Sequence, residues 1–485
     1  MIRFENVSFN YDGKNYNGIK NINIEIKKGQ FILLCGRIGC RKTTIIRIIN
    51  KLIPHFYKGS VSGQVYIGDK ELESIPMYNI SEKVGSVFQN PRSQFFNVDT
   101  DSEIAFGLEN LSYESKVINE KVNKSYRDLN IEKLRGKNIF NLSGGEKQKI
   151  AFASVYAMKP DIYVLDEPSS NLDIYAIDEL KKNIMMLKYQ GKTIIIAEHR
   201  LYYLKDIVDK ILYMKEGRID SVIEREEFLK IPNKLRENMG LRTLDLNGVI
   251  VGKKTINKEK AKFQIRDLSV GHDKLSILNN INLDVSCGEV ISIIGHNGAG
   301  KSTFLRTICG LLKKCGGIIK WDGKEINQKD ALKLTYMVMQ DVNYQLFAES
   351  VEKECTLGIK NPDMKIVDET IKSLDIYQYK DRHPAALSGG QKQRVSVAVS
   401  MICNKKILIF DEPTSGLDFD SMKKVSNLIK RLSELGKIIF IVTHDYEFIS
   451  LCCNRVVHLD NGQMLEDYYL DNSENIHKLK EFFIL

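Results

Sequence analysis

The stretch GHNGAGKST (295–303) follows the apolar run EVISII and leads into FLRTICGLL, a pattern that predicts a strand, a glycine-rich turn and a helix. Its glycines allow the backbone to curl so that successive N–H groups face one anion, and the positive N-terminal end of the helix adds to the attraction. Lys301 supplies a charge for the outer phosphates, and Ser302 supplies a hydroxyl ligand for Mg²⁺. The stretch therefore predicts a phosphate-binding loop for a nucleoside triphosphate.

A series of motifs occurs twice, in the same order, along the chain. The paired stretches are GRIGCRKTT (36–44) and GHNGAGKST (295–303), VFQNPRSQFF (87–96) and VMQDVNYQLF (338–347), LSGGEKQKIA (142–151) and LSGGQKQRVS (387–396), YVLDEPSSNLD (163–173) and LIFDEPTSGLD (408–418), and TIIIAEH (193–199) and IIFIVTH (438–444). The spacing between partners changes only by loop-sized steps, chiefly around residues 54–63, so we interpret the halves as a duplication.

The organisation of each half follows from its pattern. Short strands rich in Ile, Val and Leu alternate with helical stretches, which predicts an α/β fold with a mainly parallel, helix-covered sheet. A polar, lysine-rich segment separates the halves. We therefore predict domains at 1–228 and 263–485, joined by a linker at 229–262.

The composition is that of an ordinary globular protein, with 43% hydrophobic and 27% charged residues and a net charge of +9 spread along the chain. The nine cysteines show no CxxC pair and no metal-ligand spacing, which favours reduced thiols. Nowhere do about 18 apolar residues run together, as a membrane-spanning helix requires. We expect any work at a membrane to go through partner proteins.

Two predicted strands end in adjacent carboxylates. LIFDEP presents Asp411 and then Glu412, and the first half repeats the arrangement with Asp166 and Glu167. An aspartate at a strand end beside a phosphate loop can hold Mg²⁺ through water, and the glutamate after it can polarise an attacking water. An isolated Asp-Glu pair is more often a surface feature, so it is the phosphate loop in the same repeat that favours catalysis.

The LSGG stretches begin with capping boxes, Ser143-x-x-Glu146 and Ser388-x-x-Gln391. Such a box starts a helix in any protein. The paired glycines are not needed for the cap, and they leave the helix N-terminus bare so that an anion can approach.

The phosphate loop, glutamine segment, LSGG motif, DEP…LD motif and strand-end histidine, in this order, resemble the nucleotide-binding domain of ABC-type ATPases over nearly all of both halves. The resemblance implies two tandem P-loop ATPase domains, each with a mainly parallel core sheet, an antiparallel β subdomain and a helical subdomain. It also implies that ATP lies between the phosphate loop of one half and the LSGG motif of the other, and that hydrolysis needs Mg²⁺.

The family's functional residues map onto matching positions of this chain. The expected catalytic residues are Gln89, Glu167, His199, Gln340, Glu412 and His444. The expected Mg²⁺-binding residues are Thr43, Gln89, Asp166, Ser302, Gln340 and Asp411. The expected ATP-binding residues of the first half are Tyr11, Gly36, Gly39, Lys42, Thr43, Thr44, Ser143, Gly144, Gly145 and Glu146. Those of the second half are His272, Gly295, Asn297, Gly298, Gly300, Lys301, Ser302, Thr303, Ser388, Gly389, Gly390 and Gln391. Tyr11 fits an adenine-stacking position, where the second half has His272.

The first phosphate loop departs from the pattern at Arg41, because the second loop has Gly300 before its lysine. If the loop needs a conformation that favours glycine there, a side chain costs about 1–2 kcal/mol in backbone strain. Its bulk also intrudes on the phosphates. We therefore expect the first site to bind ATP weakly or to hydrolyse it poorly.

The segment VFQNPRSQFFNVDTDSEIAFGLEN (87–110) is similar to the ATPase subunits of energy-coupling factor (ECF) importers. The second half keeps NYQLF, with Gly358 at the position of Gly107, but lacks the Asn-Pro pair. This resemblance implies import of a vitamin or transition-metal ion, at the cytoplasmic face of the cell membrane. The implied partners are a polytopic transmembrane coupling subunit and a small substrate-binding membrane subunit, with no nucleic acid.

Two other classes stay open. Fused sugar-importer ATPases also have two such domains, but they lack the NPxxQxF run. Ribosome-associated translation factors with twin ABC domains carry a long charged helical arm, and residues 229–262 are too short for one.

Overall fold

The structure is a computed structural model, and it describes residues 1–12, 18–170, 172–252, 260–272, 275–339 and 341–484. The chain divides into two units, Met1–Leu244 (unit 1) and Asp245–Leu485 (unit 2). Each unit contains one copy of the repeated motifs.

Unit 1, over its described residues, has a six-stranded sheet and a four-stranded antiparallel sheet. The six-stranded sheet has the order β10 (Arg218–Glu224), β9 (Lys210–Lys215), β3 (Phe31–Gly36), β8 (Thr193–Ala197), β7 (Ile162–Asp166) and β6 (Val84–Val87). All its neighbouring strands are parallel except β9 and β10. The antiparallel sheet has the order β2 (Ile19–Ile26), β1 (Ile2–Tyr11), β4 (Gly59–Ile67) and β5 (Lys70–Glu71).

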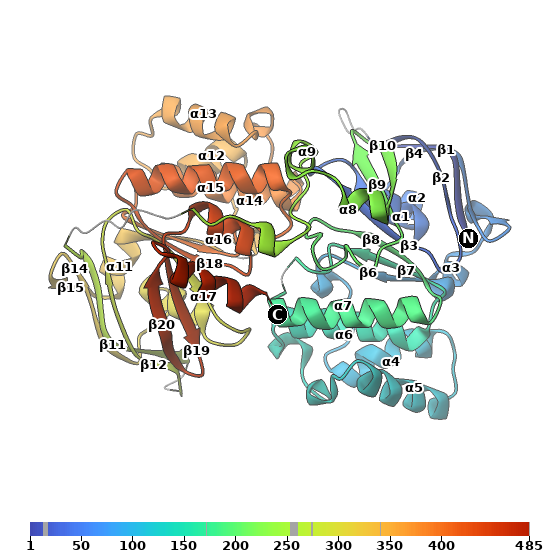
Figure 1. Cartoon of the computed structure of the whole chain (residues 1–485), viewed down its shortest axis with the longest axis horizontal. Helices are drawn as coiled ribbons and strands as arrows, with labels where there is room; N and C mark the ends of the chain where they lie inside the picture. The colour runs from blue at the N-terminus through green and yellow to red at the C-terminus, as the bar shows by residue number, and fades with distance from the viewer. Residues whose placement is uncertain (13–17, 171, 253–259, 273–274, 340, 485) are drawn as a thin grey trace. The chain divides into compact units, whose positions relative to one another are not determined.

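The helices of unit 1 cover both faces of the six-stranded sheet. They are α1 (Lys42–Ile49), α2 (Leu52–His55), α3 (Met77–Lys83), α4 (Thr100–Asn110), α5 (Ser115–Asp128), α6 (Gly144–Met158), α7 (Ile174–Tyr189), α8 (Arg225–Leu229) and α9 (Asn233–Asn238). In Figure 1, α6 and α7 lie on one face of this sheet and α1 on the other. Helices α4, α5 and α6 pack together as a helical subdomain.

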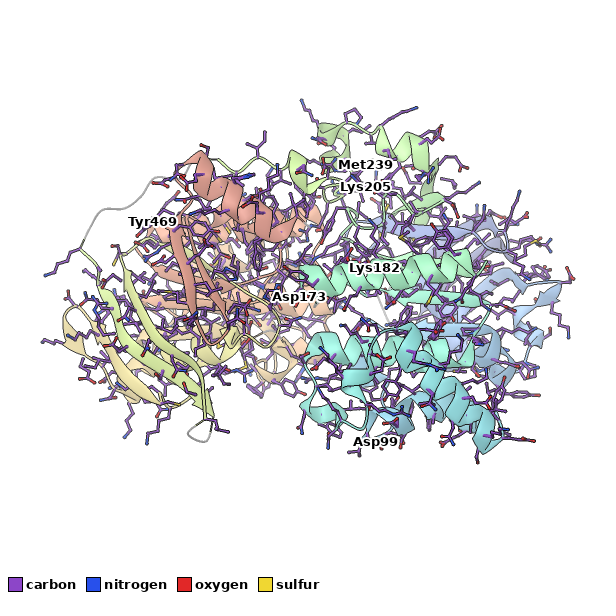
Figure 2. All side chains as sticks on the ribbon, turned by 60° about the horizontal axis from the view of Figure 1, so that its bottom comes forward. Asp99, Asp173, Lys182, Lys205, Met239 and Tyr469 are labelled. Carbon is purple, nitrogen blue, oxygen red and sulfur yellow. The ribbon has the colours of Figure 1, made fainter. Side chains whose placement is uncertain are left out.

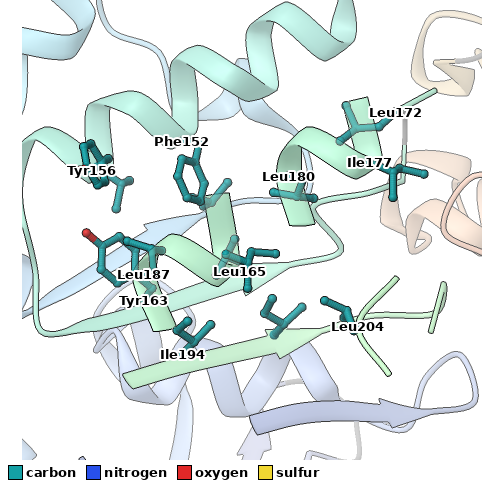
Figure 3. Close-up of a cluster of buried hydrophobic side chains, with 14 of the residues drawn as sticks. Phe152, Tyr156, Tyr163, Leu165, Leu172, Ile177, Leu180, Leu187, Ile194 and Leu204 are labelled. Atoms are coloured by element: carbon teal, nitrogen blue, oxygen red, sulfur yellow. The ribbon is translucent and has the colours of Figure 1, made fainter. Parts of the chain in front are cut away.

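The core of unit 1 explains why its central strands are apolar on both faces. Figure 3 shows Phe152 of α6 and Leu180 of α7 over Leu165 of β7 and Ile194 of β8. Side chains of β3 alternate, so that Leu33 joins this cluster while Leu34 packs with α1 and the antiparallel sheet. Each fully buried side chain of this kind contributes roughly 1.5–3 kcal/mol relative to its exposed state.

Unit 2 repeats this architecture over its described residues. Its six-stranded sheet has the order β16 (Thr335–Val338), β17 (Ile407–Asp411), β18 (Ile438–Val442), β13 (Val290–Ile294), β19 (Arg455–Asp460) and β20 (Gln463–Tyr469), with only β19 and β20 antiparallel. Its antiparallel sheet has the order β12 (Leu275–Val285), β11 (Phe263–His272), β14 (Gly316–Trp321) and β15 (Lys324–Glu325).

The helices of unit 2 include a second helical subdomain, in which α12, α13 and α14 pack together. The helices are α10 (Lys301–Ile308), α11 (Gln328–Leu334), α12 (Val351–Thr356), α13 (Met364–Ser373), α14 (Gly389–Ile402), α15 (Phe419–Glu434), α16 (Tyr446–Cys452) and α17 (Ser473–Phe483). The predicted fold class is thus confirmed in both units: a mainly parallel core sheet, an antiparallel β subdomain and a helical subdomain.

The segment that we predicted as a linker, 229–262, contains α9 and a short 3₁₀ turn at Leu246–Gly248. The boundary between the units falls inside it, after Leu244. Residues 253–259 lie outside the described residues. None of the helices in the described residues is long and apolar enough to cross a membrane.

Candidate functional site

The phosphate loop of unit 2 turns sharply between β13 and α10. Gly295 and Gly300 have φ angles of 146° and 92°, in the range that favours glycine. A Cβ on Gly295 would lie 2.0 Å from the carbonyl oxygen of Leu459, so the strand itself also demands a glycine there. The loop closes around Lys301, whose buried Nζ donates to the carbonyl oxygens of Gly295 and His296 at 2.8 Å each. Strand, turn and helix follow one another as the sequence predicts.

The phosphate loop of unit 1 has the same backbone path despite its different residue. Arg41 has φ 81° and ψ 30°, and Gly300 has φ 92° and ψ 8°. Each is the residue directly before the helix that begins with the loop lysine. The left-handed conformation costs a non-glycine residue about 1–2 kcal/mol, so Arg41 occupies a strained position.

A second substitution explains how Arg41 is accommodated. A Cβ on Gly300 would lie 2.9 Å from Cγ2 of Ile277. Counted back from the loop lysine, Gly18 stands in unit 1 where Ile277 stands in unit 2. Because Gly18 has no side chain, the nearest of the contacts that would crowd a side chain at Gly300 is missing beside Arg41. The sequence pattern did not identify Gly18, since its role depends on how the turn lies against the residues that begin β2.

The loop lysine of unit 1 faces the strand-end histidine. Lys42 is 5% exposed, and its Nζ lies 2.9 Å from Nε2 of His199 and 3.5 Å from the carbonyl oxygen of Gly36. Burial lowers the pKa of Lys42, but the charges of neighbouring acidic groups, Glu167 among them, raise it above its usual range overall. The ammonium therefore stays charged where a phosphate is expected.

The predicted acid pair of unit 1 lies beside this loop. Asp166 ends β7 and accepts a hydrogen bond from Oγ1 of Thr43 at 3.1 Å. Glu167 follows with φ 46°, accepts from Nε2 of Gln89 at 2.7 Å and has an oxygen 3.5 Å from Nε2 of His199. Burial, followed by the charge of Glu167, raises the pKa of Asp166 to about 7. The structure thus brings together Gln89, the acid pair, His199 and the phosphate loop.

Unit 2 builds the same arrangement around Asp411 and Glu412. Burial raises the pKa of Asp411, although a hydrogen bond from Ser302 lowers it. Glu412 has φ 52°, is 5% exposed and has an oxygen 3.7 Å from Nε2 of His444. Gln340 lies outside the described residues.

The donor set fits Mg²⁺. A partly buried hydroxyl and a buried carboxylate, Thr43 with Asp166 or Ser302 with Asp411, are the hard oxygen ligands that this ion prefers. The described residues contain no group of three His, Cys, Asp or Glu side chains that could hold a metal alone.

Both LSGG motifs form the predicted helix caps. Ser143 starts α6 through reciprocal bonds with Glu146, at 3.3 and 2.9 Å, and Ser388 starts α14 in a capping box with Gln391. A Cβ on Gly144 would meet nothing within 4 Å, and the same holds at the equivalent glycine of unit 2. Each helix N-terminus is therefore open to a ligand.

The aspartate that ends each DEP…LD motif also caps a helix. Asp173, labelled in Figure 2, accepts from the backbone N–H of Ala176 at 2.8 Å and starts α7. Asp418 accepts from Ser421 at the same distance and starts α15. In each unit, the segment that follows the acid pair therefore ends at a capped helix start.

Tyr11 lies over the first turn of α1. Its hydroxyl is 3.0 Å from Oγ1 of Thr44, and its ring centroid is 6.5 Å from that of Tyr57. This places an aromatic ring beside the phosphate loop, and base stacking by Tyr11 stays a prediction. His272 ends β11, and its side chain lies outside the described residues.

Comparisons with known proteins agree with this geometry. Residues 19–170 and 278–415 match the family described as ABC transporter. A Treponema denticola protein, provisionally named an ABC transporter ATP-binding protein, is 46% identical over the full length of both chains. A Methanosarcina mazei protein with the same provisional name is 32% identical and spans 96% of this chain and 88% of its own.

Among solved structures, the archaeal ribosome recycling factor aABCE1, in complex with ribosomal stalk protein aP1, is 21% identical with a TM-score of 0.65. The match covers 98% of this chain and 92% of that one, and it shows a shared fold. Two family domains, each with a phosphate loop, an acid pair and an LSGG cap, lead to one conclusion. The chain belongs to the ABC transporter family, as an ATP-binding protein with two ABC domains that hydrolyse ATP.

Proposed function

We propose that this chain is the ATP-hydrolysing subunit of an ECF-type importer that moves a vitamin or a transition-metal ion. The observation that carries the proposal is the segment 87–110, whose residues each have a defined structural role. Asn90 caps a short turn by accepting from the N–H of Arg92 at 3.1 Å. Gln94 holds the segment against the end of β6, since its side chain accepts from Phe88 and donates to the carbonyl oxygen of Ser86.

This fixed turn presents an aromatic surface. Phe96 is 74% exposed and stacks on Phe106 of α4, with ring centroids 4.9 Å apart. The carboxylate of Glu103 accepts from the N–H of Phe96 at 3.0 Å and so fixes the backbone under the ring. An exposed aromatic ring that stacks on a second ring and sits on a fixed backbone is typical of a protein-binding surface.

Unit 2 has the same arrangement of a glutamine, a glutamate and an exposed phenylalanine, in a segment of different sequence. Gln345 accepts from the N–H of Met339 and donates to the carbonyl oxygen of Met337. Glu354 accepts from the N–H of Phe347, whose ring is 72% exposed. We infer that each unit receives a helix of a polytopic coupling subunit here, and that a small membrane subunit supplies the substrate site. In this proposal the chain acts at the cytoplasmic face of the membrane.

The chemistry follows from the residues around each phosphate loop. When bound, Mg²⁺ supplies a positive charge that offsets charge on the transferred phosphoryl group. Lys42 and Lys301 hold the outer phosphates, and the loop N–H groups surround them. Glu167 and Glu412 orient and polarise the attacking water, beside His199 and His444.

The two sites are unequal in this proposal. Arg41 holds a strained backbone position at the phosphates in unit 1, whereas unit 2 has the unstrained Gly300. We therefore infer that unit 2 carries most of the turnover.

The partner is tested by purifying the tagged full chain from gently solubilised membranes of its native host. We expect a polytopic membrane protein to co-purify with a second, small and very hydrophobic protein. Phe96→Ser and Phe347→Ser should each reduce this recovery severalfold. Phe56→Ser, at a residue that is also 72% exposed but lies outside both segments, should not. Recovery of ribosomal proteins without a membrane partner would overturn the importer proposal and favour a translation factor.

A further inference from the structure

The residue before the strand-end histidine differs between the units, and it reaches the acid pair in only one of them. In unit 1 this residue is Glu198, and in unit 2 it is Thr443. Both are buried, at 2% and 0% exposure. Glu198 directly follows β8 and Thr443 directly follows β18. These two strands have equivalent places in the two core sheets, so the two positions are equivalent.

Glu198 directs its carboxylate away from the acid pair. One oxygen accepts from the backbone N–H groups of His199 at 2.7 Å and Arg200 at 3.1 Å. The other accepts from the hydroxyls of Ser169 at 2.7 Å and Tyr203 at 2.9 Å. Glu198 therefore ties the histidine to the segment after the acid pair, and it takes up the N–H of His199.

In unit 2 the same groups are directed at the acid pair itself. Oγ1 of Thr443 donates to Oε2 of Glu412 at 3.4 Å, and the N–H of His444 donates to the same oxygen at 3.4 Å. The hydroxyl of Thr443 also accepts from the N–H of Asp445 at 3.2 Å. Because that bond uses a lone pair of the hydroxyl, its hydrogen is left to point at Glu412.

The structural task that Glu198 performs is carried out by another residue in unit 2. Asp445 accepts from the hydroxyl of Thr414 at 3.0 Å, and Thr414 occupies the position of Ser169. Because Asp445 makes this contact, Thr443 is not needed to hold the segment after the acid pair. Its hydroxyl can therefore donate to Glu412.

We propose that Thr443 is a positioning residue for Glu412, and that unit 1 has no counterpart because Glu198 stands in its place. The hydroxyl holds one carboxylate oxygen of Glu412, which fixes the direction in which the other oxygen faces the attacking water. The inference rests on the proposed hydrolytic role of Glu412. It does not depend on Arg41.

The test uses the full chain with Thr443→Val, which keeps the shape of the side chain and removes the hydroxyl. We expect kcat for ATP to fall about fivefold or more, with KM for ATP changed less than about twofold. Thr443→Ser restores the hydroxyl and should restore kcat.

A buried threonine elsewhere in unit 2 provides the matched control. Thr370 is 6% exposed on α13, which packs on α14 and carries none of the predicted site residues. Thr370→Val should leave kcat and KM for ATP in place, whatever it does to the unfolding temperature. If Thr443→Val lowers only the unfolding temperature and leaves kcat unchanged, the positioning role is wrong.

Failure of the inference can be told apart from failure of the proposed hydrolytic role. Glu412→Gln tests that role alone, and it should abolish most of the turnover. A chain that loses turnover on Glu412→Gln but not on Thr443→Val keeps the hydrolytic role and rejects the inference. A chain that is insensitive to Glu412→Gln rejects both.

Discussion

At the scale of single residues, the two halves differ most at the position before the loop lysine. Arg41 adopts a left-handed backbone conformation that its counterpart Gly300 adopts without strain. Gly18 removes one of the contacts that would crowd a side chain there. The first loop therefore keeps the backbone path of a phosphate loop with an arginine before its lysine, and in the proposal above this arginine weakens the first site.

This asymmetry predicts unequal effects of two matched substitutions. Glu412→Gln should lower phosphate release at saturating ATP by about tenfold or more, whereas Glu167→Gln should lower it less than about threefold. The reason is that, in the proposal, Arg41 already limits the first site. Arg41→Gly in the Glu412→Gln chain should raise nucleotide affinity. Equal losses from the two glutamine variants would contradict the inequality.

The acid pair of unit 1 predicts a dependence of stability on pH. Burial and the charge of Glu167 raise the pKa of Asp166 to about 7 without metal or nucleotide. The folded chain then holds a proton that the unfolded chain releases near pH 4, so this group lowers stability as pH rises from about 4 to 7. Asp166→Asn should remove that fall, with a gain on the order of 2 kcal/mol at pH 7.5.

The measurement is chemical unfolding of the metal-free, nucleotide-free chain at pH 5 and pH 7.5. The gain from Asp166→Asn should be larger at pH 7.5 than at pH 5. A gain that is the same at both pH values would contradict the raised pKa.

At the scale of elements, each LSGG motif is first of all a helix start. Reciprocal bonds between Ser143 and Glu146 satisfy two donors at the N-terminus of α6. Ser143→Ala should destabilise unit 1 by about 1 kcal/mol, measured by urea unfolding without nucleotide. Ser115→Ala, in the first turn of α5, removes a serine that does not cap its helix and should cost less. An equal cost would show that the cap is not what stabilises α6.

The turn before α4 predicts a separation of binding from hydrolysis. Gln94 holds this turn through two bonds to the backbone of the β6 end. Gln94→Ala should free the turn, so that recovery of the membrane partner falls severalfold while affinity for ATP changes less than about twofold. Loss of ATP affinity in equal measure would instead place Gln94 in the support of the nucleotide site.

At the scale of the whole molecule, each unit has its own core. The clusters around β3 and β7 lie within Met1–Leu244, and the cluster around β13 and β17 lies within Asp245–Leu485. Residues 1–244 expressed alone should therefore fold and unfold cooperatively, as followed by circular dichroism. Aggregation without a cooperative transition would show that the first unit needs the second.

The sequence predicted the fold because its motifs are local. The geometry of a glycine-rich turn between an apolar strand and a helix is determined by the residues of the turn itself. The same holds for a helix start with a serine three residues before a glutamate. The roles of Gly18 and Glu198 were missed, since each depends on a contact with a segment far away in the chain. The unit boundary after Leu244 falls inside the polar segment 229–262 that the sequence marks as a linker, although that segment also holds the helix α9.

The pairing of Gly18 with Arg41 has a consequence for how this chain can change over generations. A glycine could return at position 41 in one step and relieve the strain. Position 18 cannot follow so easily, because a Cβ there would lie 1.6 Å from the carbonyl oxygen of Phe9. The two positions therefore differ in how freely they can change. Position 41 can take a glycine with no movement of the backbone, whereas position 18 can take a side chain only if the backbone at Phe9 also moves.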